Sequence, residues 1–216
     1  MKTLTLDSIG RTYGTDKVSA IHDYLSFYAE KFESIRYENF VMFELGVFRG
    51  ASVQMWEEYF PKASVIGVDY DQEANRYNRG RVSIEIGNAG DKEFLRSIVK
   101  KHGQPRIIID DASHRWDHQI IGLQTLFPLL SPGGHYVIED IDTSFEQHLR
   151  NAPFQGESQI SAIDYVYKLA RCVVGDAALG SEKPYDAFIA DYYPHVNSIE
   201  LYRRLALVNK RMTRRP

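Results

Sequence analysis

Cysteine is almost absent from this sequence of 216 residues, in which Cys172 is the only one. A single cysteine excludes a disulfide within the chain and leaves no zinc site built from several cysteines. Cys172 lies in an apolar stretch with helical spacing, so we expect it in the core. Chains without disulfides are typical of reducing compartments, and the sequence therefore favours a cytoplasmic protein.

Long apolar runs and an excess of positive charge are also missing. The N-terminus, MKTLTLDSIGRTYG, lacks the apolar core of a signal peptide, and no apolar run approaches the roughly 18 residues of a membrane-spanning helix. The 26 Lys and Arg residues are outnumbered by 29 Asp and Glu, which gives a net charge of -3. We therefore expect neither a membrane nor a nucleic acid as a partner, and the basic residues at 210–215 are interpreted as a solvated chain end.

What is present is an alternation of short apolar runs and helical patterns. Strand-like runs occupy 39–45, 64–71, 81–87, 106–111 and 135–140. Helical spacing of apolar residues is found at 18–36, 50–60, 91–103 (capped by Asp91), 158–179 and, with Ser113 as its cap, from 113 to about 130. The strand-like runs are continuously apolar, which predicts parallel strands covered by helices on both faces. Two further strand-like segments within 195–211 are close enough for a hairpin, so the last strand is expected to be antiparallel.

Polar residues and glycines follow the ends of these runs. In open α/β sheets, ligands bind at the carboxyl ends of the strands. The residues that this rule brings to one edge are Glu44, Gly46, Asp69, Asn88, Asp110, Asp111, Glu139 and Asp140. Their coincidence predicts a ligand site there.

The turn after the first run, ELGVFRGAS, is expected to approach a ligand. Gly46 and Gly50 allow a tight turn, and Ser52 can add a contact. Asp69 ends the next run about 20 residues later, where a carboxylate can accept both ribose hydroxyls. A nucleoside is therefore predicted, although glycines that only pack helix on strand remain the alternative. The turn has neither GxGxxG nor the lysine of a phosphate-binding loop, so it suits a nucleoside with an amino-acid tail rather than a pyrophosphate.

Several motifs give the sequence a resemblance to a known family. ELGVFRG, the acid of GVDYD, and LLSPGGHYVIED resemble the class I S-adenosylmethionine-dependent methyltransferases. GTDK at 14–17, HDYLSFYAEKF at 22–32 and IDDASH at 109–114 look like the metal-dependent sugar O-methyltransferases of antibiotic biosynthesis, the macrocin and mycinamicin group with its cephalosporin hydroxylase-like relatives. The resemblance implies a Rossmann-like α/β fold with a seven-stranded, mostly parallel sheet whose last strand is antiparallel. The single domain is expected to consist of an N-terminal helical segment (1–38), a cofactor-binding core (39–140) and acceptor-side segments with the terminal hairpin (141–216).

The resemblance also implies the chemistry of the site. It makes S-adenosylmethionine the cofactor, Asp111 and Asp140 ligands of magnesium, and His114 the catalytic base. The residue types agree, because magnesium prefers carboxylate oxygens, a metal acidifies a bound hydroxyl, and histidine is the most frequent general base. His114 is expected on the first turn of the helix after Asp111. Glu139 could add a ligand, although consecutive residues of a strand point to opposite faces.

Other residues receive weaker assignments. Asp110 is expected to face the cofactor, where its charge would favour a sulfonium or amino group, and Asn88 to pair with adenine. His118 lies four residues after His114, so a zinc pair is conceivable, but no third nitrogen ligand is evident, and His118 is interpreted as a residue that supports a site residue or the fold. The remaining site candidates, by resemblance or position only, are Lys17, His22, Tyr28 and the segment 191–195.

The predicted acceptor is a small molecule, a natural product that carries a glycosyl hydroxyl, and a homo-oligomer stays open. Four other functions also stay open: a methyltransferase for a non-sugar hydroxyl, a nucleotide-dependent oxidoreductase of Rossmann type, a metal-dependent hydrolase, and a non-catalytic relative. The missing GxGxxG argues against the oxidoreductase, and the glycine turn with Asp69 against the hydrolase. The presence of Asp111, His114 and Asp140 argues against the non-catalytic relative.

Overall fold

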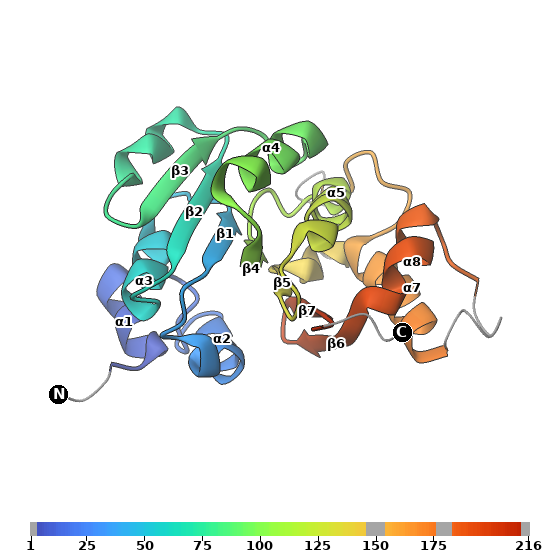
Figure 1. The fold of residues 1–216 in the computed structure, drawn as a ribbon, viewed down its shortest axis with the longest axis horizontal. Helices are drawn as coiled ribbons and strands as arrows, with labels where there is room; N and C mark the ends of the chain where they lie inside the picture. The colour runs from blue at the N-terminus through green and yellow to red at the C-terminus, as the bar shows by residue number, and fades with distance from the viewer. Residues whose placement is uncertain (1–3, 146–153, 176–182, 213–216) are drawn as a thin grey trace.

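A seven-stranded sheet in the order β3-β2-β1-β4-β5-β7-β6 runs through the described part of the chain (Figure 1). The computed structural model describes residues 4–145, 154–175 and 183–212, and the parts of our predictions that fall on 146–153, 176–182 and 213–216 lie outside the described residues. The strands are β1 (Val41–Leu45), β2 (Ser64–Asp69), β3 (Val82–Ile86), β4 (Pro105–Asp110), β5 (His135–Ile138), β6 (Val196–Tyr202) and β7 (Leu205–Lys210).

Strands β1 to β5 run parallel, whereas β7 runs antiparallel to both of its neighbours, β5 and β6. The predicted terminal hairpin with an antiparallel last strand is therefore confirmed. The register aligns the ends of adjacent strands, because Leu45 on β1 pairs with Asp110 on β4, and Asp110 pairs with Ile138 on β5. Residues that directly follow β4 and β5 must then lie at one edge of the sheet.

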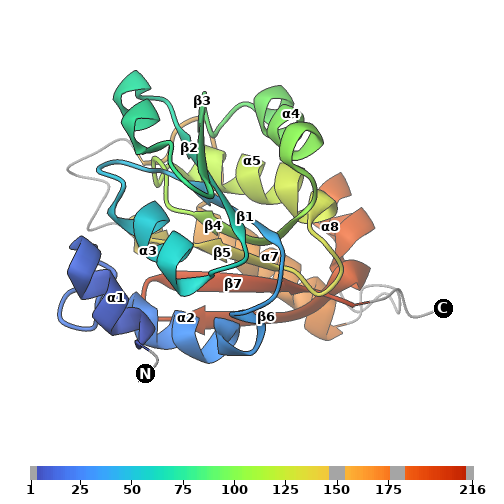
Figure 2. The same ribbon diagram turned by 60° about the vertical axis from the view of Figure 1, so that its left-hand side comes forward.

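Helices cover both faces of the sheet (Figure 2). They are α1 (Leu6–Tyr13), α2 (Tyr24–Phe32), α3 (Ala51–Tyr59), α4 (Lys92–His102), α5 (Trp116–Leu126), α7 (Ala162–Gly175) and α8 (Ala187–Tyr192). The first three pack into one core and the other four into a second core on the opposite face. On β4, Ile107 and Ile109 face the first core and Ile108 the second, which explains why these strands are continuously apolar. Within the described ranges, none of the helices is both long and apolar enough to cross a membrane.

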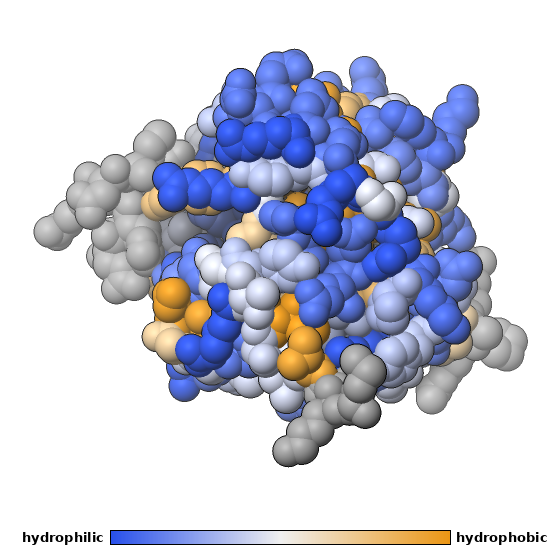
Figure 3. Space-filling model, turned by 90° about the vertical axis from the view of Figure 1, so that its left-hand side faces the viewer, coloured by the Kyte–Doolittle hydropathy of each residue, from blue (hydrophilic) through white to orange (hydrophobic). Residues whose placement is uncertain are grey.

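The N-terminal segment differs from the single helical pattern predicted at 18–36. The helix α1 was not predicted; Thr5 caps its start, and Gly14 ends it in the left-handed conformation. α2 begins only at Tyr24, because Asp23 before it has a φ of 59°, which a helix does not contain. Figure 3 shows that the side of the molecule with α1 and α3 is mainly hydrophilic, as expected of helices that bury one face.

The helix predicted to start at Ser113 also differs. α5 begins at Trp116, and its capping position is Arg115, whose side chain makes no capping hydrogen bond. The N–H of Trp116 instead donates to the carbonyl of Phe154 at 2.7 Å, so a tertiary contact replaces the expected cap. By contrast, Asp91 caps α4 as predicted.

Candidate active site

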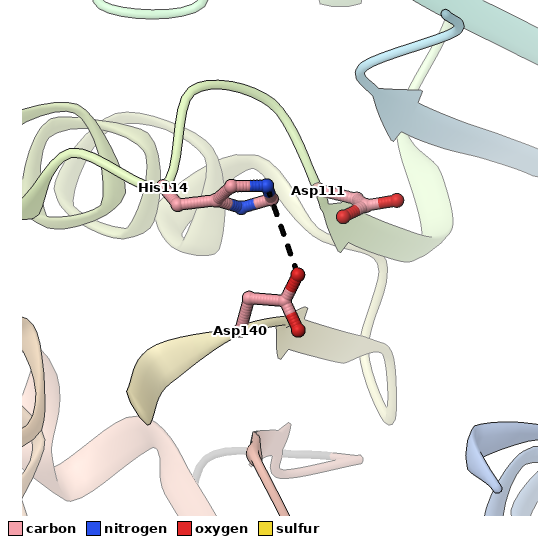
Figure 4. Close-up of side chains that lie close together, drawn as sticks. All are labelled: Asp111, His114 and Asp140. Carbon is pink, nitrogen blue, oxygen red and sulfur yellow. Dashed lines mark ion pairs between the residues drawn. The ribbon is translucent and has the colours of Figure 1, made fainter. Parts of the chain in front are cut away.

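Asp111, His114 and Asp140 come together at the carboxyl edge of the sheet (Figure 4). Asp111 directly follows β4, and Asp140 comes shortly after the end of β5, so the two acids belong to neighbouring strands. One ligand atom from each of the three side chains lies within 4.8 Å of the other two. The Nε2 atom of His114 is 3.7 Å from Oδ2 of Asp140. The structure thus brings together Asp111 and Asp140, two of the three predicted metal ligands, and His114, the predicted base.

Each of the two carboxylates has one oxygen bonded to the protein and one left over. Asp111 accepts a hydrogen bond from Nζ of Lys17 through Oδ2. Asp140 accepts one from the hydroxyl of Tyr24 through Oδ1, and Nη2 of Arg204 lies 2.9 Å from the same oxygen. Among the described residues, Oδ1 of Asp111 and Oδ2 of Asp140 accept no hydrogen bond. Donors on one oxygen fix the orientation of a carboxylate and leave the other for a metal ion, so this pair fits a divalent cation.

His114 differs from its prediction in one respect, because it is not on the first turn of α5. It lies in the turn before α5 with a φ of 55°, which excludes a helix at this position. Its Nδ1 is buried and has no hydrogen-bond partner within the described part of the chain. The other described non-glycine residues with positive φ are Asp23, Phe48 and Asp140, which lie at or beside this site. Unusual backbone conformations of this kind are concentrated where function requires them.

Glu139, predicted as a further metal ligand, is not part of this group. Its side chain is buried, with Oε1 accepting a hydrogen bond from the Tyr28 hydroxyl at 2.5 Å and Oε2 one from Nζ of Lys17 at 2.6 Å. Burial alone would lower the pKa of Lys17, but the charges of Asp111 and Glu139 outweigh it and raise this pKa well above the usual value of lysine. Lys17 is therefore a buried ammonium group between the carboxyl groups of Asp111 and Glu139, and burial raises the pKa of Glu139 well above its usual value.

The donors to these acids were mostly missed by sequence reasoning. Tyr24 and Arg204 were not predicted, and Lys17 and Tyr28 were candidates by resemblance only. His22 makes a ring contact with Tyr24, with centroids 5.2 Å apart. No local pattern marks any of these residues, because their partners lie far away in the sequence.

The segment 191–195 does not lie near the acids. It leads into β6, which runs in the same direction as β5 because both are antiparallel to β7. Val196 at the start of β6 pairs with Lys210, and the adjacent Asn209 pairs with His135 at the start of β5. The segment therefore adjoins the amino edge of the sheet, and the prediction that it closes the ligand pocket is wrong.

A cavity of about 610 Å³ opens beside the acidic group, at the carboxyl ends of β1 to β4. A smaller cavity of about 260 Å³ shares Gly46, Phe48 and Asp111 with it and is also lined by Lys17 and Ser52. The walls of the larger cavity are formed by Gly46, Phe48, 68–71, 87–89, 111–113 and His118. Its size is typical of a pocket for a small organic ligand.

Part of the predicted cofactor-binding set lines these cavities. Its members there are Gly46, Ser52, Asp69 and Asn88. Gly46 has a φ of 97°, and a Cβ atom on it would lie 2.1 Å from the carbonyl oxygen of Asp111, so only glycine allows the ends of β1 and β4 to approach. Asp69 accepts hydrogen bonds from the N–H groups of Val47 and Phe48, both at 2.9 Å, and thereby fixes the turn after β1.

Glu44 and Gly50 line neither cavity. The buried carboxyl of Glu44 accepts hydrogen bonds from the Ser52 hydroxyl at 2.9 Å and from Nε1 of Trp56 at 3.3 Å. Burial raises the pKa of Glu44 to about 7. Gly50, with a φ of 71°, precedes α3, and a Cβ atom on it would clash with the ring of Tyr77. Both residues support the start of α3 from outside the walls of these two cavities.

The prediction that Asp110 faces the cofactor is wrong. Along β4, side chains alternate, so Asp110 shares the face of Ile108 and points toward α5. There its Oδ2 accepts a hydrogen bond from the Tyr136 hydroxyl at 3.0 Å, and Gly122 leaves room for it. Burial raises the pKa of Asp110 to about 7.

His118 lies in the wall of the larger cavity. Its Nδ1 is 2.9 Å from Oγ of Ser113, and a Cβ atom on Gly90 would lie 2.5 Å from its ring. Burial lowers the pKa of His118, which favours the neutral ring. These contacts fit the interpretation of His118 as a structural residue.

No family model matches the chain. Among curated proteins, it is 29% identical over 212 residues to the 8-demethyl-8-(2-methoxy-alpha-L-rhamnosyl)-tetracenomycin-C 3'-O-methyltransferase of Streptomyces olivaceus, covering 95% of this chain and 53% of the relative. It is 27% identical over 214 residues to the demethylmacrocin O-methyltransferase of Streptomyces fradiae, again covering 95% and 53%. The chain thus spans about half the length of the curated relatives it matches.

A solved structure of the MycE methyltransferase from the mycinamycin biosynthetic pathway, in complex with Mg and SAH, is similar with a TM-score of 0.81. Its sequence is 25% identical, and the match covers 97% of this chain and 55% of that chain. The sheet order and the antiparallel β7 give this chain the fold of the class I S-adenosylmethionine-dependent methyltransferases. Within that class, its resemblance to the sugar O-methyltransferases of antibiotic biosynthesis is confirmed by these relatives.

Proposed function

We propose that this chain is a methyltransferase domain that transfers a methyl group from S-adenosylmethionine to a glycosyl hydroxyl on a natural product. The observation that carries the proposal is the group of Asp111, His114 and Asp140 beside a cavity that suits a nucleoside. The curated relatives support it, because their names describe O-methyltransferases with glycosylated acceptors. A cytoplasmic location is part of the proposal and is supported by the single cysteine.

In this proposal, S-adenosylmethionine occupies the two cavities and supplies an electrophilic methyl group. Asp69 and Asn88 line the larger cavity, where a carboxylate suits ribose hydroxyls and an amide suits adenine. Oδ1 of Asn88 accepts a hydrogen bond from the N–H of Gly90 at 2.8 Å, which leaves the side-chain NH₂ group to donate. Gly46 and Ser52 line the smaller cavity, whose volume suits the amino-acid tail.

Magnesium would be held by Asp111 and Asp140, through the oxygens that lack protein donors in the described ranges. Bound there, the ion would make a coordinated hydroxyl more acidic. The imidazole of His114 lies at the edge of the same group, where it can take the hydroxyl proton. Glu139 enters the proposal as the buried partner of Lys17 rather than as a direct ligand, because both of its oxygens already accept hydrogen bonds.

We further propose that the three parts of the chain act as one domain. The core (39–140) contributes the acids and the cofactor cavity. The N-terminal segment (1–38) contributes donors such as Lys17, and the last part (141–216) contributes Arg204.

A calorimetric titration with S-adenosylhomocysteine, with magnesium or with EDTA, tests the function. We expect binding in both arms, and turnover of a glycosylated acceptor with magnesium only. His114→Ala should bind S-adenosylhomocysteine like the wild type but lose about 10²–10⁴-fold in turnover, the usual contribution of a general base. The control His102→Ala, at the end of α4 beside Glu85, should keep full turnover.

Two results would contradict the function. One is the absence of S-adenosylhomocysteine binding by a folded sample that carries no co-purified cofactor. The other is tight binding of NAD or NADP in its place, which would favour the oxidoreductase.

A further inference from the structure

Asp140 is held by donors from two segments that are far from it in the sequence. Tyr24, the first residue of α2, donates its hydroxyl hydrogen bond to Oδ1 of Asp140 at 2.5 Å. Arg204, in the turn between β6 and β7, places Nη2 2.9 Å from the same oxygen. The turn is also tied to this region by its backbone, since the N–H of Ile141 donates to the carbonyl of Arg204 at 3.0 Å. One oxygen of Asp140 is therefore fixed by the protein.

This arrangement determines where the second oxygen of Asp140 points. Asp140 lies beyond the end of β5 with a φ of 50°, outside the regular pairing of the sheet. With Oδ1 fixed, Oδ2 lies 3.7 Å from Nε2 of His114, inside the group of possible metal ligands. A carboxylate freed from its donors can rotate and lose this orientation.

We propose that Tyr24 and Arg204 are positioning residues that orient Asp140 toward a divalent cation beside His114. The inference rests on the proposed function, because it requires that Asp140 binds the ion. The ring of Tyr24 is fully buried in the core, and a phenylalanine ring would fill the same space. The hydroxyl of Tyr24 therefore differs from phenylalanine mainly in its hydrogen bond to Asp140.

The neighbouring acids also accept hydrogen bonds from the segment around α2. Tyr28, one turn further along α2, donates to Glu139, and Lys17, before α2, donates to Asp111 and Glu139. The segment 17–28 thus provides a donor to each acid that follows β4 or β5 in this cluster. This regularity supports an outer shell of donors rather than an isolated contact.

The substitution Tyr24→Phe tests the proposal without changing any charge. Mn²⁺ serves as the probe, because it suits carboxylate ligands and its free concentration is measured by electron paramagnetic resonance. We expect Tyr24→Phe to weaken Mn²⁺ binding about tenfold or more, the usual effect of removing a donor to a metal ligand. Arg204→Lys keeps the positive charge but loses the planar fork, so it should weaken binding in the same direction.

The matched control is Tyr202→Phe. The hydroxyl of Tyr202 donates to Oδ2 of Asp23 at 3.3 Å, and among the described residues it contacts none of the acids of the proposed metal site, so Mn²⁺ affinity should stay unchanged. All variants are measured at a temperature where circular dichroism shows them folded, which separates metal affinity from stability.

The outcomes separate this inference from the function on which it rests. If the wild type binds Mn²⁺ and both Tyr24→Phe and Arg204→Lys bind it equally well, the inference alone is overturned. A lower unfolding midpoint for Tyr24→Phe without a change in affinity also overturns it, because the hydroxyl then only supports the packing of α2. If the wild type binds no Mn²⁺, the inference fails together with the metal part of the proposed function.

Discussion

Replacing Lys17 by methionine removes a buried cation from between Asp111 and Glu139. Lys17 is 2% exposed and Glu139 is 1% exposed, so the substitution leaves a buried carboxylate whose remaining donor in the described chain is the hydroxyl of Tyr28. Removing one member of a buried ion pair lowers the free energy of unfolding by about 3–5 kcal/mol, because the charge of the other member stays buried without compensation. For a chain of this length, that loss corresponds to a fall of about 6–20 °C in the unfolding midpoint.

Thermal unfolding followed by circular dichroism measures this effect, with urea unfolding as an independent measure of free energy. The double variant Lys17→Met, Glu139→Gln removes both charges and should recover most of the loss, since uncharged replacements of a whole buried pair are often neutral. Lys31→Met is the matched control, because Lys31 forms an ion pair with Glu200 at the surface and should contribute less than about 1 kcal/mol. The reasoning is refuted if Lys17→Met unfolds like the wild type, or if the double variant is no more stable than Lys17→Met.

Two further predictions concern residues outside the acidic cluster. Burial raises the pKa of Asp110 to about 7, so its contribution to stability is fully present below about pH 4, where the unfolded chain is also protonated, and is lost as the pH rises through about 7. Asp110→Asn should therefore reduce the fall in the free energy of unfolding between about pH 4 and pH 7. Urea unfolding at several pH values in this range measures that fall, and an equal fall in the wild type and the variant would contradict the argument. Asp91→Ala should lower the free energy of unfolding by about 1 kcal/mol, because it removes the acceptor for the N–H groups of Glu93 and Phe94 at the start of α4. Asp91→Ser, which can still cap the helix, should lose much less in the same measurement.

The position of the acids could be predicted because two simple rules determine it. Continuous apolar runs identify the buried parallel strands, and the register of such strands brings their carboxyl ends to one edge. Asp111 and Asp140 follow the neighbouring strands β4 and β5, so their proximity required no knowledge of side-chain packing. Gly46, Asp69 and Asn88 were placed at the larger cavity by the same reasoning.

The orientation of single side chains could not be predicted in this way. Asp110 and Asp111 are consecutive, and only the observed face of β4 shows that Asp110 points toward Tyr136 rather than into the cavity. His114 was placed on a helix because Ser113 resembles a cap, whereas a contact from Phe154 sets the start of α5. Such contacts join residues that are far apart in the sequence, and no local pattern records them.

The distribution of charge around the acids explains how this site can exist before an ion binds. Asp111, Glu139 and Asp140 are acidic groups in close proximity, and a site of carboxylates alone would depend on its metal to fold. Here Lys17 pairs with Asp111 and Glu139, and Arg204 pairs with Asp140 and Asp142, so the protein supplies part of the compensating charge itself. The charge that remains uncompensated suits magnesium, which keeps several waters and is usually bound through one or two carboxylates. Because the donors occupy one oxygen of each carboxylate, an ion bound to the other oxygens would keep coordination positions for water or for the acceptor hydroxyl of the proposed function.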